Sequence, residues 1–150
     1  MCNLPGDDEM KIRLVENSIS VEEYLHIRDR VNWRKLTEQQ ARQAIDNSLL
    51  IVKAYDEETG GLLGMGRLIG DGAVICYIQD LIVIPEAQGQ HIGSMIISRL
   101  REYADSIREE GTTMMLCLMC AKGREPFYVK HGFTVRPNDD LGPGMITFLN

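Results

Sequence analysis

Residues 79–93 read Gln-Asp-Leu-Ile-Val-Ile-Pro-Glu-Ala-Gln-Gly-Gln-His-Ile-Gly, and this stretch decides more about the fold than any other. The apolar run from Leu81 to Ile84 predicts a strand that ends before Pro85. A short loop follows, and a long amphipathic helix is expected to begin near His91. The first N–H groups of a helix have no partner within it and lie at its positive end. The stretch therefore predicts a site that can hold a pyrophosphate.

The loop before this helix matches neither of the two common phosphate-binding motifs. The chain has no G-x-x-x-x-G-K-[ST], and the spacing of its glycines fails G-x-G-x-x-G. The loop resembles instead the acetyl-CoA-binding motif of the GNAT superfamily of N-acetyltransferases. That motif is an apolar strand followed by Arg/Gln-x-x-Gly-x-Gly/Ala at a helix start. Here it reads Gln88-Gly-Gln-His-Ile-Gly93, with His91 in place of the first motif glycine.

A second stretch carries the same resemblance. Phe127-Tyr-Val-Lys-His-Gly-Phe133 is similar to the family motif Phe-Tyr-x-x-x-Gly-Phe. Two partial motifs in the right order are more specific together than either is alone. With the order of the elements below, the resemblance covers nearly the whole chain.

Length and composition are those of an ordinary globular protein. The 150 residues fit one domain, spanning 1–150, and the hydrophobic content of 44% with 25% charged residues is typical. No apolar run approaches the roughly 20 residues that span a bilayer, and residues 1–10 lack a secretory signal pattern. We therefore expect a cytoplasmic protein without a membrane partner.

The net charge of −6 argues against a nucleic-acid partner, because the chain has no basic stripe to release counterions. The charge is compatible with a cationic substrate such as an amine, although mild acidity is common without such a role. The four cysteines, Cys2, Cys76, Cys117 and Cys120, form no zinc or disulfide pattern. We expect buried free thiols and no metal site.

The order of predicted elements indicates an α/β (α+β) fold. Strands are expected at 11–15, 49–55, 62–69, 74–84, 113–119, 133–136 and 145–149. Helices are expected at 20–31, 37–47, 90–107 and 125–131, the first two opened by the capping boxes Ser20–Glu23 and Thr37–Gln40. This order is also the one that the resemblance implies. It predicts a GNAT-like mixed, mostly antiparallel sheet of about six to seven strands flanked by about four helices.

The resemblance implies which residues would bind acetyl-CoA. The main-chain N–H of Leu81 would meet the thioester carbonyl, and Ile82 and Val83 would pair with the pantetheine arm. The N–H groups that would hold the pyrophosphate are those of Gln88, Gly89, Gln90, His91, Ile92, Gly93 and Ser94. We expect a helical backbone at His91, whose imidazole caps the helix, stacks or contacts phosphate. The alternative is a surface residue without a role.

Tyr128 matches the family tyrosine that donates to the departing thiolate. A phenol with a pKa of about 10 is protonated at pH 7 and can donate a hydrogen bond. Without the motifs, a tyrosine beside a phenylalanine on a short helix is more often a packing residue. Both interpretations stay open at this point.

The group that accepts the proton of the amine has more than one candidate. Tyr77 stands where some family members carry a glutamate. Asp80 is the nearest carboxylate, and it reaches the same face only if a bulge re-aims it. Asp80 is therefore either the catalytic base or a structural, hydrogen-bonded residue, and ordered water is the third option.

The resemblance implies that Trp33 and Tyr77 border the acceptor pocket. Trp33 lies between the first two predicted helices and is either an aromatic wall or core. Lys122 and Arg124 precede the tyrosine helix, where they either reach the phosphates or form a solvated loop.

The sequence thus predicts an enzyme, an acetyl-CoA-dependent N-acetyltransferase that acts on the primary amine of a small molecule without a metal. Three alternatives remain. The chain is a protein N-acetyltransferase, a catalytically silent acyl-CoA-binding domain, or an unrelated α/β domain whose Gln-Gly-Gln loop is only a turn. The resemblance also implies that a homodimer can form, since members of the family often dimerise.

Overall fold

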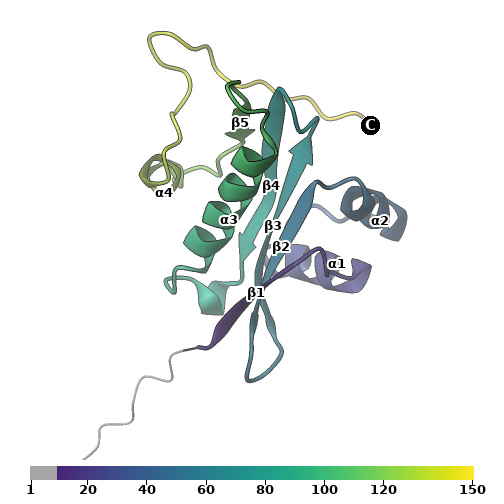
Figure 1. Cartoon of the computed structure of the whole chain (residues 1–150). Coiled ribbons are helices and arrows are strands. Elements are labelled where there is room, and N and C mark those ends of the chain that lie inside the picture. The colour runs from purple at the N-terminus through teal and green to yellow at the C-terminus, as the bar shows by residue number, and fades with distance from the viewer. Residues whose placement is uncertain (1–9) are drawn as a thin grey trace, which may run out of the picture.

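The computed structural model describes residues 10–150 and contains one sheet with helices on both of its faces (Figure 1). The strands are β1 (Ile12–Glu16), β2 (Leu50–Asp56), β3 (Leu62–Gly70), β4 (Ile75–Val83) and β5 (Met115–Leu118). The helices are α1 (Val21–Arg30), α2 (Glu38–Asp46), α3 (Ile92–Ile107) and α4 (Glu125–Lys130). A short 3₁₀-helix, η1 (Pro85–Ala87), connects β4 to the segment before α3.

The sheet is mixed and mostly antiparallel, as expected. Its strand order is β1-β2-β3-β4-β5, and only the β4–β5 pair is parallel. Helices α1 and α2 lie on one face, and α3 crosses the other face along β2, β3 and β4 (Figure 1). The parallel pair is joined through α3, which is the connection that parallel strands require.

The starts of α1 and α2 confirm the two predicted capping boxes. The Ser20 hydroxyl accepts from the N–H of Glu23, whose carboxylate accepts from the N–H of Ser20. Thr37 and Gln40 make the same reciprocal pair at the start of α2. Each box satisfies two N–H groups that the helix leaves without partners.

The core lies between α3 and the middle of the sheet. Ile92, Ile96 and Leu100 of α3 are at most 1% exposed. Gly66 of β3 permits this close approach, because a Cβ there would lie 2.7 Å from Cγ2 of Ile96. Any side chain at position 66 would collide with Ile96, so the absence of one lets α3 pack directly on the backbone of β3.

A β-bulge interrupts β4 opposite Gly66. Met65 pairs with Ile82 and Arg67 pairs with Gln79, so Asp80 and Leu81 together face one residue of β3. Asp80 has a φ of 56° at this point. The bulge turns the Asp80 side chain toward α1, because two residues occupy the place of one in the ladder.

The sheet has fewer strands than the sequence predicts. Neither 133–136 nor 145–149 forms a strand, and among residues 10–150 none pairs with the outer edge of β5. Asn138 closes a turn with Leu141, and the segment after it has no ladder partner. The apolar residues there remain exposed, Met145 at 88% and Leu149 at 94%. An apolar run predicts a strand only where a neighbouring strand can pair with it.

The missing neighbours also change β5 itself. The sequence predicts a strand over 113–119 that is buried on both faces, but β5 spans only Met115–Leu118. Met115 is 50% exposed, and the thiols of Cys117 and Cys120 belong to residues of intermediate burial. Only Cys76 is a fully buried thiol, as expected, while Cys2 lies outside the described residues.

None of the helices within residues 10–150 is both long enough and apolar enough to cross a membrane.

Candidate functional site

The edge of β4 is open where β4 continues past the end of β5. Strand β5 pairs with Ile75–Ile78 only, whereas β4 extends to Val83. No strand among the described residues pairs with Gln79–Val83 on that side. The main chain of Leu81 to Val83, predicted to meet acetyl-CoA, therefore has no strand partner among the described residues on the β5 side.

The turn after β4 leads directly into the start of α3. Gly89 has a φ of 83°, and His91, the residue before the helix, has a φ of 63° and a ψ of 15°. The expectation of a helical backbone at His91 is therefore wrong. The motif position needs a left-handed backbone, which glycine adopts freely and histidine adopts at a cost.

Among residues 10–150, no side chain caps the start of α3. His91 makes no capping hydrogen bond, so the first N–H groups of this 16-residue helix have no side-chain acceptor. Ile92 points into the core at 1% exposed, which fixes the direction of the helix. A free positive helix end beside an open strand edge is an arrangement that can bind a phosphate group.

Helix α4 packs against this helix start. A Cβ placed on Gly93 would lie 3.4 Å from Cζ of Phe127, so there is room for little beyond a methyl group. Ser94 Oγ and His131 Nε2 lie 3.0 Å apart and share a hydrogen bond. Burial, together with Lys130 and Arg101, lowers the pKa of His131 below its usual value, which favours the neutral ring.

Tyr128 lies on the same helix as Phe127, between two aromatic rings. Its ring contacts Phe127 and Phe133 edge to face, with centroids 5.1 and 6.1 Å away. Burial raises the pKa of Tyr128 above its usual value, and the nearby groups of Cys120 and Tyr77 act in the same direction. The phenol therefore stays protonated at neutral pH and can donate, which is the state that its predicted role requires.

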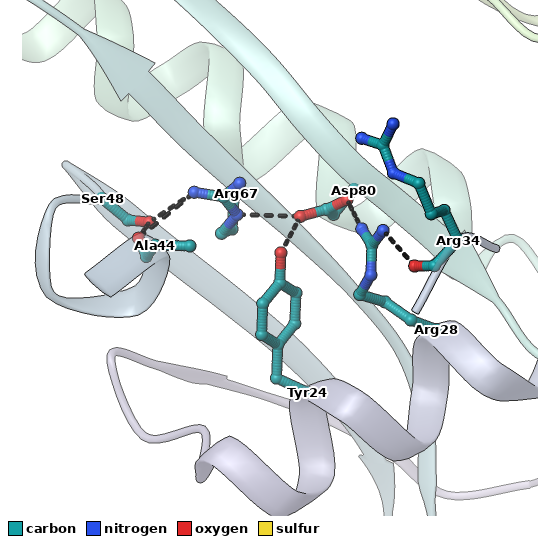
Figure 2. Close-up of polar contacts among 7 residues, drawn as sticks. All are labelled: Tyr24, Arg28, Arg34, Ala44, Ser48, Arg67 and Asp80. Atoms are coloured by element: carbon teal, nitrogen blue, oxygen red, sulfur yellow. Dashed lines mark hydrogen bonds and ion pairs between the residues drawn. The ribbon is translucent and has the colours of Figure 1, made fainter. Parts of the chain in front are cut away.

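On the other side of β4, the carboxylate of Asp80 is enclosed by three donors (Figure 2). Arg28 Nη1 donates to Oδ1 at 2.6 Å, and Arg67 Nε donates to Oδ2 at 2.9 Å. The hydroxyl of Tyr24 also donates to Oδ2. Burial and the neighbouring Asp80 raise the pKa of Tyr24 to about 12, so its phenol keeps the proton that it shares.

This geometry disfavours Asp80 as the base that accepts a proton from an amine. The side chain is fully buried, at 0% exposed, and both oxygens are engaged. Both carboxylate oxygens already accept from buried donors, so a proton from an amine could reach Asp80 only by displacing one of these hydrogen bonds. The bulge does re-aim Asp80, but toward α1 rather than toward a free surface.

Sequence reasoning missed the partners Tyr24, Arg28 and Arg67. A signal was present, because Arg67 interrupts the apolar strand Leu62–Ile69 and Arg28 shares a helical face with Tyr24. A charged residue at a position that should be buried usually has a counter-charge nearby. Arg67 also donates to the carbonyl of Ala44 and to Ser48, so the network ties α1, α2 and the sheet together.

Trp33 lines a cavity of about 310 Å³ between α1 and the connection to α2. The resemblance to the GNAT superfamily predicts that Trp33 borders an acceptor pocket. Tyr77 is not among the residues that line this cavity, and it lies instead on the side of β4 that faces Cys117 and Tyr128. The structure therefore does not bring Trp33 and Tyr77 together.

Lys122 and Arg124 lie in the exposed connection between β5 and α4. Within residues 10–150, no group of three or more His, Cys, Asp or Glu side chains is arranged to hold a metal ion.

Comparison with known proteins gives consistent results. The family model described as the acetyltransferase (GNAT) domain matches residues 46–135. The chain superimposes with a TM-score of 0.78 on a Staphylococcus aureus protein of unknown function described as a probable acetyltransferase, with 28% identity over 91% of this chain and 99% of that one. A GNAT family protein of Streptococcus pneumoniae gives a TM-score of 0.75 and 28% identity, with 92% and 98% covered.

A curated relative is an uncharacterized N-acetyltransferase of Prochlorococcus marinus, 28% identical over 109 residues. The match covers 71% of this chain but spans only 58% of the relative's length.

Proposed function

This chain belongs to the GNAT family of acetyltransferases, and on that premise we propose that it transfers the acetyl group of acetyl-CoA directly to the primary amine of a small molecule. The observation that carries the proposal is the open edge of β4, which runs from the end of β5 to the uncapped start of α3. Along this path, backbone N–H groups can donate both to the thioester of an extended acetyl-CoA molecule and to its pyrophosphate.

The proposed chemistry needs few side chains. The amine nitrogen attacks the thioester carbonyl, the carbon–sulfur bond breaks, and the N–H of Leu81 donates to the oxygen on which negative charge develops. Such a donor contributes about 3 kcal/mol to the transition state. Tyr128 donates its proton or a hydrogen bond to the departing thiolate.

After the carbon–nitrogen bond forms, the nitrogen loses one proton, which replaces the proton that the thiolate takes. Before the attack, an acceptor in its ammonium form must also lose one proton. The carboxylate of Asp80 is paired with two arginines, so we assign the proton that the ammonium group loses to solvent water rather than to a carboxylate. An amine with a pKa near 10 then reacts through the small fraction that is neutral, and the rate rises with pH.

A second candidate, a catalytically silent acyl-CoA-binding domain, is favoured by two observations. His91 occupies a backbone conformation that suits glycine, and the nearest carboxylate is sequestered. Both proposals predict binding of acetyl-CoA, but only the first predicts turnover.

Calorimetric titration with acetyl-CoA is the first test. We expect binding in the micromolar range and a loss of at least about 100-fold in Gly93→Glu, because a carboxylate beside the helix start opposes a phosphate. Gly93→Ala is the matched control, since a methyl group fits against Phe127. Undiminished binding by Gly93→Glu would place the ligand elsewhere on the chain.

Turnover separates the two candidates. Release of free thiol from acetyl-CoA is measured with a panel of primary amines, with acetylated product identified by mass spectrometry. Acetylated amine supports the transferase. Tight binding without any acetylated product would leave the silent binding domain.

A further inference from the structure

The cavity beside Trp33 has a charge opposite to that of the whole chain. Its lining includes three cationic side chains, Arg28, Arg34 and Lys35, and one carboxylate, Asp29. The chain as a whole has a net charge of −6. A local excess of positive charge in an acidic protein attracts an anion to that place.

The buried network behind the cavity is also positive. Arg28 and Arg67 are 9% and 8% exposed, and both pair with the single carboxylate of Asp80, which is fully buried. Among the described residues, no second carboxylate forms an ion pair with either guanidinium group. The pair of arginines thus keeps one uncompensated charge, which is costly to bury unless an anion lies close by.

Arg28 links the network to the mouth of the cavity. Its Nη2 donates to the carbonyl of Arg34 at 3.1 Å, which holds the connection between α1 and α2 in place (Figure 2). The side chain of Arg34 extends away from Asp80, and its guanidinium lies 4.8 Å from the ring centre of Phe148 in the C-terminal segment. Arg34 and Lys35 are therefore exposed cations on a fixed backbone.

Arg28 connects the cavity to the part of β4 that the proposed function places beside the reacting centre. Arg28 lines the cavity and bonds directly to Asp80, and Asp80 immediately precedes Leu81. An acceptor held in this cavity would lie on the Arg28 side of β4. Its amine would then face β4 while its other end remains among the cations.

We propose that this cavity binds an anionic group, a carboxylate or a phosphate, on the acceptor amine. The proposal rests on the proposed function and narrows its substrate to amines that also carry a negative charge. Arg34 and Lys35 contact the anion, and Trp33 forms the wall beside it. The net charge of the whole chain is compatible with a cationic substrate, but the lining of this cavity carries more positive than negative side chains.

The test compares acceptors that differ only in the anion. 3-Aminopropanoate is paired with propylamine, and O-phosphoethanolamine with ethanolamine, and kcat/KM is measured for each. We expect at least one acceptor that carries the anion to be preferred over its match without the anion by about tenfold to hundredfold, the range of a charge-assisted contact. The pair with the larger preference shows whether carboxylate or phosphate is the natural group. Equal kcat/KM within both pairs would overturn the proposal.

Two variants locate the effect. In Arg34→Gln/Lys35→Gln the preference should disappear, through a higher KM for the acceptor that carries the anion and an unchanged KM for the acceptor that lacks it. Arg42→Gln, an exposed arginine on α2 outside the cavity, is the control for the loss of a positive charge and should keep the preference. Retained preference in the double variant would contradict the site.

A binding measurement separates this proposal from the function on which it rests. O-Phosphoethanolamine and 3-aminopropanoate are titrated into the protein without acetyl-CoA, and chemical shifts of the Trp33 indole are followed. If no amine is acetylated but these probes bind the wild type and not the double variant, the anion site stands and the transferase fails. If neither probe perturbs Trp33 at millimolar concentration, the anion site fails, whatever the turnover.

Discussion

The two sides of β4 are built in different ways. Toward β5 and the start of α3, the candidate site consists of main-chain groups from one continuous stretch of sequence, Leu81 to Ser94. Toward α1, it consists of side chains brought together from α1, β3 and β4, with Asp80 at their centre. On the first side, the exposed side chains can be replaced at little cost in stability, although Ile82 and Ile92 belong to the core. The charged side chains of the second side cannot be replaced in this way, because each charge depends on the others.

The largest effect is expected at Asp80. Asp80→Ala leaves two buried guanidinium groups without a counter-charge and should lower the free energy of unfolding by about 3–5 kcal/mol, measured by chemical denaturation. Gly93→Ala on the other side of β4 should cost less than about 1 kcal/mol. Asp80→Asn tests the alternative role: if it keeps wild-type stability and loses turnover, Asp80 is a catalytic base and the comparison fails.

The next effect is on catalysis rather than on stability. Tyr128→Phe keeps the ring contacts with Phe127 and Phe133 but removes the donor, so kcat should fall by about 100-fold with little change in affinity for acetyl-CoA. Because the pKa of Tyr128 is raised, the loss of its proton should not reduce the activity below about pH 10. An unchanged kcat would reduce Tyr128 to a packing residue.

A smaller effect, in the opposite direction, is expected at His91. His91→Gly removes a side chain from a left-handed backbone position and should stabilise the fold by about 1 kcal/mol, measured by thermal unfolding. Gln90→Gly, at the neighbouring position where φ is not positive, is the matched control and should give no such gain. A loss of stability in His91→Gly would mean that the imidazole makes a contact that outweighs the backbone cost.

The smallest effect is a dependence on pH at the contact between α3 and α4. The pKa of His131 is lowered in the folded state, so the neutral ring stabilises the fold above the pKa of the unfolded chain, and that contribution is lost as the pH falls. We expect the melting temperature to fall slightly more between pH 7 and pH 5 in the wild type than in His131→Gln. Equal slopes would show that this contact does not depend on the protonation of His131.

Sequence reasoning succeeded where the signal is local. The capping boxes at Ser20 and Thr37 and the strand–turn–helix around Gly89 are confirmed, because each depends on residues a few positions apart. It failed where structure depends on distant partners. The two expected C-terminal strands have no neighbour to pair with, and Asp80 meets Arg28 across 52 positions in the sequence. The predicted roles of the site residues, the acceptor and the homodimer stay predictions.

Trp33 is the only tryptophan of the chain, so all of the tryptophan fluorescence of the protein comes from this residue. The indole is 38% exposed at the wall of the cavity, with the Arg28 guanidinium 5.4 Å from the centre of its ring. Fluorescence excited at wavelengths that tyrosine does not absorb then comes from one known position. A shift in its colour on adding a compound can be assigned to that cavity without a label, so unpurified compound collections can be screened directly.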